Sequence, residues 1–191
     1  MFLKENEIIR IGLREVGRNV LIDTAAVFIR PQNVSIGHDV RIDAFCIISA
    51  GEDGVVMGNY IHLGAGSMIF GGGGKVEFED FSCLSSRVSV FSVSDDYSGE
   101  SLTNPMTPDD LKQLNKGPVT LKRHALVGCG SVIMPGVTVG MGAAVGALSF
   151  VNKDIPELSI GVGTPVRIAG KRSAKFLDLE KAFMARLQTS R

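Results

Sequence analysis

Residues 121–156 read LKRHAL VGCGSV IMPGVT VGMGAA VGALSF VNKDIP, six repeats of six residues that follow one another without a gap. The fifth position of each repeat is mostly small or aliphatic, and glycine often takes the second. A period of six fits neither the helical period of 3.6 residues nor the two-residue alternation of a strand. It predicts a prism in which each repeat forms one flat side and a turn, and three repeats complete a coil. The first position is always aliphatic and is expected to point inward: Leu121, Val127, Ile133, Val139, Val145 and Val151.

The same repeat extends upstream in blocks that begin at Val16, Ile36, Met57 and Phe78. Eighteen first positions can be counted along the chain, which predicts about six coils of about 18 residues each. The blocks at Ile36, Met57 and Phe78 are 21 residues apart, so the surplus residues at 50–56 and 71–76 should protrude as loops from one corner. The predicted fold class is therefore all-β, a parallel β-solenoid over residues 16–170.

Three segments lie outside the repeat. A long excursion at about residues 92–118 interrupts the coils, and a short helix is expected within it from Pro108. A loop of this length in a compact protein is usually functional. Residues 1–15 form a lead-in that is weakly helical from residue 4. Residues 171–191 form the C-terminal segment, in which residues 172–188 are predicted to be a helix that caps the solenoid, with an apolar face of Phe176, Leu179, Phe183 and Leu187.

Composition excludes several classes of protein. Twenty Lys and Arg balance 20 Asp and Glu among 191 residues, so no overall charge attracts nucleic acid or an anionic membrane. No apolar run approaches the roughly 18 residues of a membrane-spanning helix, and the N-terminus lacks the pattern of a signal peptide. The three Cys residues lack the spacing of a metal site, which predicts a reduced, cytoplasmic protein without a metal.

Residues 117–156, followed by GVGTPVRIAGKR at 161–172, resemble the hexapeptide-repeat, left-handed β-helix acyltransferases, among them the galactoside, maltose and nucleotide-sugar acetyltransferases. The tract SSRVSVFSVSDDYSGESLTNP at 85–105 is similar to that of acyltransferases of nucleotide-linked 4-amino-4,6-dideoxy sugars. The resemblance implies a left-handed coil, an acyl-CoA donor (most simply acetyl-CoA), a homotrimer, and active sites between neighbouring prisms.

The resemblance also implies where coenzyme A lies. In the family, pantetheine runs along the last coils against backbone amides and small side chains. Cationic side chains after the last coil could hold the phosphates as paired positive charges. The matching residues of this chain are Cys129, Ala147, Asn152 and Lys153 for the pantetheine arm, and Arg167, Lys171 and Arg172 for the phosphates. Thr164, which precedes these cations, is the remaining predicted cofactor-binding residue.

The candidates for the acceptor site lie in or near the excursion. Sugar acetyltransferases of this fold commonly place a catalytic His in the long loop, but this loop has none. The three His residues, His38, His62 and His124, all lie within repeats, and His62 is the candidate base among them. Asp95 and Asp96 are the stronger catalytic candidates, because a carboxylate can hold a sugar ammonium and accept its proton.

An alternative interpretation of the Asp pair is a loop turn in which Asp caps backbone amides. Ser85 and Ser86, one side of the coil away, could hydrogen-bond the sugar or the carboxylates. Tyr97 and Glu100 of the same loop complete the predicted substrate-binding residues. Cys46 and Cys83 are interpreted as core residues.

These observations favour a cytoplasmic N-acyltransferase that acts on the amine of a nucleotide-linked amino sugar for surface polysaccharide synthesis, for example of lipopolysaccharide. One alternative is a sugar O-acetyltransferase of the galactoside type. Another is a non-catalytic hexapeptide solenoid that serves assembly or binding. The predicted partners are the acyl-CoA, the sugar acceptor and two further copies of the chain; neither nucleic acid nor a membrane is expected.

Overall fold

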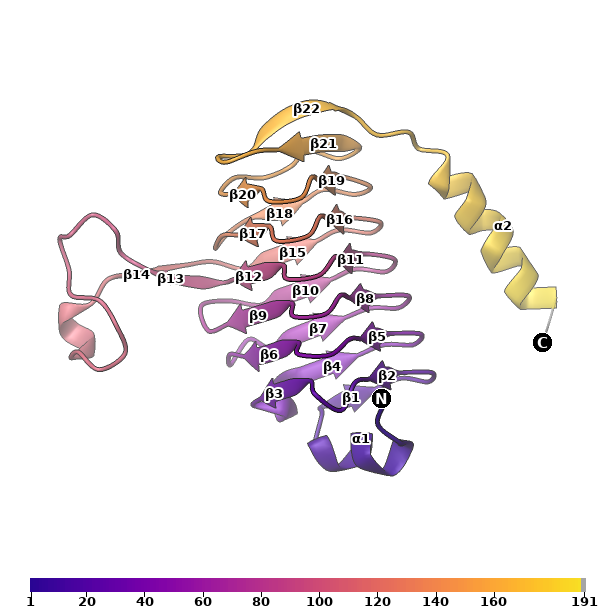
Figure 1. Cartoon of the computed structure of the whole chain (residues 1–191), viewed down its shortest axis with the longest axis horizontal. Coiled ribbons are helices and arrows are strands. Elements are labelled where there is room, and N and C mark those ends of the chain that lie inside the picture. Colours follow the sequence, from indigo (N-terminus) through magenta and orange to yellow (C-terminus); the bar gives the residue numbers. More distant parts are fainter. Residues whose placement is uncertain (190–191) are drawn as a thin grey trace.

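A computed structural model describes residues 1–189 of the chain as a three-sided prism of parallel strands with a projecting arm, one helix at the N-terminal end of the prism and a second helix beside it (Figure 1). Face 1 consists of β1 (Glu15–Val16), β4 (Val34–Ile36), β7 (Val55–Met57), β10 (Val76–Phe78), β15 (Val119–Leu121) and β18 (Thr138–Val139). Face 2 consists of β2 (Leu21–Ile22), β5 (Arg41–Ile42), β8 (His62–Leu63), β11 (Cys83–Leu84), β16 (Leu126–Val127), β19 (Ala144–Val145) and β21 (Ser159–Val162). Face 3 consists of β3 (Val27–Ile29), β6 (Ile47–Ala50), β9 (Met68–Gly71), β12 (Ser89–Phe91), β17 (Val132–Ile133) and β20 (Phe150–Val151).

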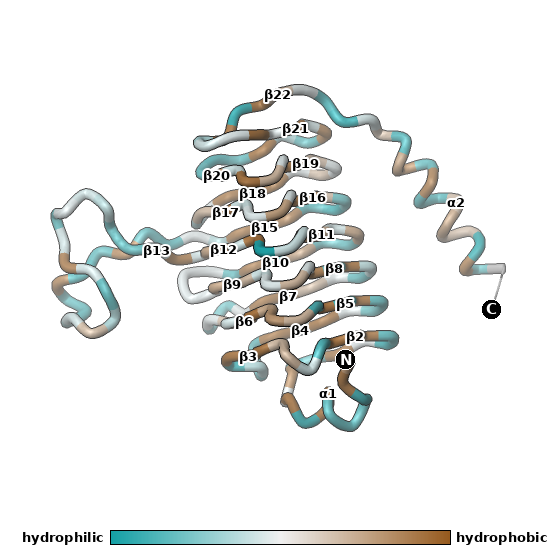
Figure 2. The backbone as a smooth tube through the Cα atoms, in the orientation of Figure 1, coloured by the Kyte–Doolittle hydropathy of each residue, from teal (hydrophilic) through white to brown (hydrophobic). Residues whose placement is uncertain are grey.

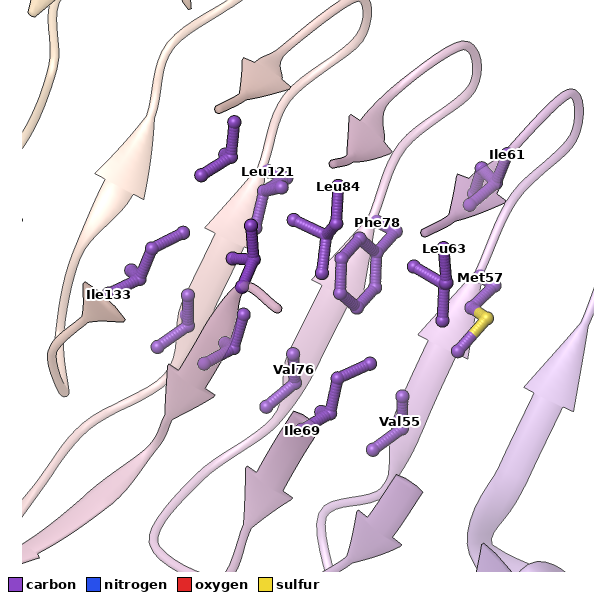
Figure 3. Packing of buried hydrophobic residues seen from close by; sticks show 14 of the residues in the cluster. Val55, Met57, Ile61, Leu63, Ile69, Val76, Phe78, Leu84, Leu121 and Ile133 are labelled. Carbon is purple, nitrogen blue, oxygen red and sulfur yellow. The ribbon is translucent and has the colours of Figure 1, made fainter. Parts of the chain in front are cut away.

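The six predicted coils are confirmed within residues 1–189, and β21 begins a seventh. From Ile36 onward the first position of each repeat is buried, as predicted, and the side chains of Leu63, Leu84 and Val127 are completely buried in successive coils. Val16, in the first coil, is an exception and is 43% exposed. Figure 3 shows Leu63, Leu84 and the ring of Phe78 pointing into the space that the strands enclose. Because strands stack about 4.8 Å apart, these columns form one narrow continuous core.

The corners of the prism place non-glycine residues in the left-handed region of the backbone. The corner between faces 2 and 3 uses Phe45 (φ 62°), Arg87 (φ 59°) and Leu148 (φ 56°), with glycine at the intervening coils. A left-handed residue lets each side turn sharply within six residues. The glycines at the second position of the repeat serve close packing: a Cβ on Gly128 would lie 2.5 Å from the backbone nitrogen of Ala147 in the next coil.

Residues 92–118 form an arm that leaves the prism from the end of β12 (Figure 1). Two antiparallel strands, β13 (Val93–Asp95) and β14 (Leu114–Lys116), make its base. The short helix expected from Pro108 is a single 3₁₀ turn, η2 (Asp109–Leu111). A second 3₁₀ turn, η1 (Pro31–Asn33), lies in the first coil. Figure 2 shows that the arm is largely hydrophilic, in contrast to the strands of the prism.

The two helices cover different surfaces. α1 (Glu5–Ile11) lies across the N-terminal end of the prism, where Ile8 is buried. The predicted C-terminal helix is confirmed as α2 (Phe176–Thr189), but it lies beside the prism rather than over its end (Figure 1). The end is closed instead by β22 (Arg167–Lys171), which folds back antiparallel on β21, and by the buried side chain of Val166. No helix in the described part of the chain is long and apolar enough to cross a membrane.

An aromatic column explains why α2 lies along the side. The rings of Tyr60, Phe81 and His124 stack on one another at the corner between faces 1 and 2, with centroids 4.6 and 4.8 Å apart. Phe183 of α2 packs edge-on against Tyr60, 5.3 Å away. The helix therefore buries its aromatic residues against this column, which the repeat pattern alone did not reveal.

Candidate active site

One corner of the prism carries the predicted serines and three of the predicted cofactor residues. The amide of Gly130 donates a hydrogen bond to the carbonyl oxygen of Ser86 at 3.0 Å, and the amide of Leu148 donates to the carbonyl of Cys129 at 2.8 Å. The hydroxyl of Thr164 donates to the carbonyl of Leu148 at 3.2 Å. We call this corner between faces 2 and 3 the serine corner. It brings together Ser85, Ser86, Cys129, Ala147 and Thr164.

Buried hydroxyl groups fix the backbone of the serine corner from inside. The Ser131 and Ser149 hydroxyls both donate to the carbonyl of Gly146, at 3.0 and 2.8 Å. The amide of Gly163 in turn donates to the Ser149 hydroxyl at 3.0 Å. These hydrogen bonds satisfy the inward polar groups and hold neighbouring coils together at the corner.

Two predicted cofactor residues lie elsewhere. Asn152 and Lys153 follow β20 and occupy the next corner of the same coil, between faces 3 and 1, so they do not join Cys129 and Ala147 within one chain. The six-residue period of the repeat explains why these residues lie at different corners. Cys129 and Ala147 are 18 residues apart, one full coil, whereas Asn152 lies about one side further along.

The three predicted phosphate ligands have different surroundings. Arg167 is exposed on β22 beside Val162, next to the turn that holds Thr164. Lys171 is exposed at the other end of β22. Arg172 instead donates to the carbonyl oxygens of His124 at 2.9 Å and Gly142 at 3.2 Å, and its guanidinium lies 5.0 Å from the Phe176 ring centroid. Arg172 therefore anchors α2 and faces away from the serine corner.

The two predicted aspartates differ in their hydrogen bonds, and Asp96 is bound within the arm. The Asp96 carboxylate accepts hydrogen bonds from the Ser98 amide at 2.9 Å, the Ser98 hydroxyl at 2.8 Å and the Ser101 hydroxyl at 3.1 Å. The hydrogen bond from the Ser98 amide is the main cause that lowers the pKa of Asp96, and the Ser98 hydroxyl adds to it. Asp96 thus holds the turn at the start of the arm, as the loop-turn interpretation predicted.

Asp95 is the carboxylate that remains available to a ligand. It is exposed on β13 opposite Leu114, and among residues 1–189 its side chain has no recorded hydrogen bond or ion pair. It borders a cavity of about 600 Å³, together with Tyr97 from the arm. The Glu100 side chain is exposed further along the arm. The other walls of the cavity are largely apolar and come mainly from face 3: Phe91, Val132, Met134 and Phe150.

Ser85 and Asp95 lie at opposite edges of face 3 in the same chain. Ser85 precedes β12 at the serine corner, and β13 continues outward from the far end of β12 (Figure 1). An extended run of seven residues, such as 89–95, spans roughly 20 Å. One small substrate group therefore cannot touch both side chains of a single chain.

The structure pairs the predicted base His62 with an aspartate that the sequence did not single out. The Nε2 atom of His62 lies 2.8 Å from a carboxylate oxygen of Asp43, and Arg41 donates to the other oxygen at 2.7 Å. Burial alone would raise the pKa of Asp43, but the hydrogen bonds from His62 and Arg41 lower it below its usual value. The pair lies on face 2, below the serine corner.

The other two histidines are structural. The Nδ1 atom of His38 accepts a hydrogen bond from the Arg18 amide at 2.8 Å. His124 belongs to the aromatic column, and its Nε2 lies 2.7 Å from the Glu180 carboxylate of α2. Cys46 is buried in the core and Cys83 is partly buried, and burial raises the pKa of both thiols. Within residues 1–189, no group of three His, Cys, Asp or Glu side chains is arranged to hold a metal ion.

Known proteins resemble the whole chain. No family model matches it. The dTDP-4-amino-4,6-dideoxy-D-glucose acyltransferase of Escherichia coli is 41% identical over 182 residues, which cover 95% of this chain and 94% of the relative. The galactoside O-acetyltransferase of Lactococcus lactis is 36% identical over 75 residues, 38% of this chain and 36% of the relative.

Solved structures extend the likeness to three dimensions. AntD, an N-acyltransferase from Bacillus cereus in complex with dTDP and 3-hydroxybutyryl-CoA, has a TM-score of 0.95 and 40% identity over 98% of both chains. Further structures of AntD contain a substitution of one serine or of one aspartate. One of the serine variants, in complex with dTDP-4-amino-4,6-dideoxyglucose and coenzyme A, has a TM-score of 0.94 and 39% identity over 97% of both chains. The chain therefore belongs to the left-handed β-helix acyltransferase family of the dTDP-4-amino-4,6-dideoxy-D-glucose acyltransferase, and it is an acyltransferase.

Proposed function

We propose that this protein transfers the acyl group of an acyl-CoA, with acetyl-CoA as the simplest donor, to the amine of a nucleotide-linked 4-amino-4,6-dideoxy sugar. The name of the E. coli relative and the ligands of the B. cereus structures support this substrate class. The observation that carries the proposal is the serine corner, which lines up Ser85 and Ser86 with Cys129, Ala147 and Thr164.

The serine corner suits the pantetheine arm of coenzyme A. Three coil steps separate Ser86 from Thr164, which is about 14 Å at the spacing of β-strands. Most side chains along this strip are small; Leu148 is the exception, because its side chain is 75% exposed and lies over the glycine one coil below. In this arrangement Arg167 receives the phosphates at the C-terminal end of the prism, and the thioester reaches the coil of Ser85.

Ser85 and Asp95 are the proposed reactive-site residues for the acceptor. The B. cereus variants replace a serine and an aspartate ten positions apart, and Ser85 and Asp95 have the same separation. Ser86 and Asp96 have it too, but Asp96 is occupied by its hydrogen bonds within the arm. The unpaired carboxylate of Asp95 therefore fits the role of holding the sugar ammonium.

The chemistry needs no strong base. The ammonium gives one proton to Asp95, and the free amine nitrogen attacks the thioester carbonyl carbon. The C–N bond forms and the C–S bond then breaks, while the departing thiolate takes the second proton from nitrogen. The Ser85 hydroxyl hydrogen-bonds the reacting groups and keeps them in line. The products are an amide, coenzyme A as its thiol, and one proton released to solvent from Asp95.

The proposed assembly is a homotrimer in which the arm of one chain reaches the serine corner of the next. The separation of Ser85 and Asp95 within a chain supports a site shared between chains. The outward side of face 3 supports it as well, because this side is apolar, with Val27 and Ile29 almost half exposed and Phe70 stacked on Phe91. A contact between two different surfaces closes into a ring when the rotation is three-fold.

We place the enzyme in the cytoplasm, where its three free cysteines stay reduced, and assign its product to surface polysaccharide such as lipopolysaccharide. The acceptor is tested with acetyl-CoA and either dTDP-4-amino-4,6-dideoxyglucose or its analogue with a hydroxyl at the same carbon, following release of free thiol. We expect turnover with the amine and little with the hydroxyl. Equal or faster turnover of the hydroxyl analogue would contradict the proposal.

A further inference from the structure

The serine corner carries two residues that the proposed chemistry does not use, Arg87 in the coil of Ser86 and Phe45 two coils below it. The amide of Arg87 donates to the carbonyl of Ala65 at 2.9 Å, and the amide of Gly66 donates to the carbonyl of Ala44 at 2.9 Å. These bonds stack Phe45, Gly66 and Arg87 at the same corner in three successive coils. Phe45 and Arg87 are therefore two coil steps apart, about 10 Å.

Both side chains point outward and are free to meet a ligand. Phe45 has a left-handed backbone, and its side chain is 71% exposed. Arg87 is exposed, and among residues 1–189 its guanidinium has no recorded hydrogen bond or ion pair. Gly66 leaves a gap between them, and the Arg87 stem leans over it, with Cγ 3.4 Å from where a Cβ on Gly66 would be.

The charges nearby favour an anion at Arg87. Among the described residues that form the serine corner in the coils from Ala44 to Leu148, Arg87 is the only Lys or Arg. The carboxylate that precedes Phe45 by two residues, Asp43, is already paired with Arg41 and His62. A free guanidinium that no carboxylate neutralises is suited to a phosphate group, which it can bind with two parallel hydrogen bonds.

We infer that Phe45 and Arg87 bind the nucleoside diphosphate of the acceptor, with the base against the Phe45 ring and the phosphates on Arg87. The inference rests on the proposed function, which places the sugar at Ser85 and coenzyme A on the coils above. The nucleotide then extends down the corner in the opposite direction, so that the two substrates meet end to end at the coil of Ser85. A base stacked on an aromatic ring and a phosphate on arginine are both common modes of nucleotide recognition.

The test measures binding of dTDP, dTMP and coenzyme A to the full-length protein by calorimetry. Arg87→Gln should weaken dTDP about tenfold or more and dTMP less, because a charge-assisted hydrogen bond to the second phosphate is lost. Phe45→Leu should weaken dTDP and dTMP about equally, also about tenfold, because the stacking ring is lost while an apolar side chain remains. Coenzyme A should bind both variants as it binds the wild type.

Two matched variants control for general effects. Arg30→Gln removes another exposed arginine with a left-handed backbone, φ 56°, but at a different corner. Leu179→Ala removes an apolar side chain that is 70% exposed on α2. Both should bind dTDP like the wild type. Sedimentation of every variant checks that the assembly is retained.

Three results would overturn the inference, and they differ from one another. Unchanged dTDP affinity in both Arg87→Gln and Phe45→Leu would show that the nucleotide binds elsewhere. Dissociation of Phe45→Leu into single chains, with unchanged dTDP affinity in Arg87→Gln, would show that this strip is a subunit contact. Wild-type protein that binds coenzyme A but not dTDP would refute the proposed acceptor itself.

Discussion

The carbonyl oxygen of Ser86 accepts a hydrogen bond from the amide of Gly130 at 3.0 Å. The whole arm, residues 92–118, lies between these two residues in the sequence, yet they stack in neighbouring coils. This bond places the predicted acceptor serines directly below the first of the predicted cofactor residues at the corner. The corner therefore provides one line along which both substrates can approach.

Ser85→Ala should lower kcat about 10- to 100-fold, because one positioned hydrogen bond to the reacting groups is lost. The affinity for coenzyme A should change little, since the coils above Ser85 remain intact. Ser86→Ala is the matched control and should retain most of the activity. Steady-state kinetics with the amino sugar would contradict the assignment if Ser86→Ala were the more damaging change.

Asp95→Asn should lower turnover of the amino sugar about 100-fold, because the amide keeps the size of the carboxylate but can neither hold the ammonium nor take its proton. Asp96→Asn should instead weaken the turn with Ser98 and Ser101, which limited proteolysis of the arm would detect. His62→Asn should cost less activity than Asp95→Asn. A nearly inactive His62→Asn beside an active Asp95→Asn would identify an imidazole base and favour a hydroxyl acceptor.

Arg167→Gln should weaken binding of coenzyme A about tenfold, with little change in thermal stability, because Arg167 is exposed and proposed to bind phosphate. Arg172→Gln should do the reverse. Its guanidinium satisfies the carbonyl oxygens of His124 and Gly142, so its loss should lower the melting temperature by several degrees. Calorimetry and thermal unfolding separate the two effects, and a loss of coenzyme A affinity in Arg172→Gln alone would contradict the assignment.

The docking of α2 should weaken in acid. Burial lowers the pKa of His124 below its usual 6.5, and the guanidinium groups of Arg123 and Arg172 lower it further. The Glu180 carboxylate that contacts His124 is also paired with Arg123. A histidine with a lowered pKa contributes stability that is complete above about 6.5 and is lost as the pH falls through the folded-state pKa.

The wild type should therefore lose more thermal stability between about pH 7.5 and 5.5 than His124→Asn, in which asparagine tolerates the left-handed backbone. The comparison concerns the change with pH, since removing His124 from the aromatic column lowers stability at every pH. A wild type that is more stable at the lower pH would show that the ion pair of His124 with Glu180 dominates instead.

The repeat was sufficient to predict the coils because its period determines which side chains point inward, as Leu63 and Leu84 do. The same period places Asn152 one side of the prism further along the coil than the column of Cys129, although the family resemblance assigned both residues to one coenzyme A site. The position of α2 could not be predicted, because it depends on rings from distant coils, such as Tyr60 and Phe183, that meet only in the folded protein. Likewise, the sequence does not reveal that the Asp96 side chain has hydrogen-bond partners in the arm, whereas the adjacent Asp95 side chain has none among the described residues.

The central claim is that each active site takes Ser85 from one chain and Asp95 from its neighbour. Ser85→Ala and Asp95→Ala proteins, each expected to keep at most about a tenth of the wild-type turnover alone, can be mixed, dissociated and reassembled, and their turnover measured with the amino sugar. Random association gives about one adjacent pair in four with both residues intact, so the account predicts recovery of about a quarter of the wild-type activity per site. Reassembled mixed trimers with no recovered activity would place both residues in sites of a single chain and contradict the account.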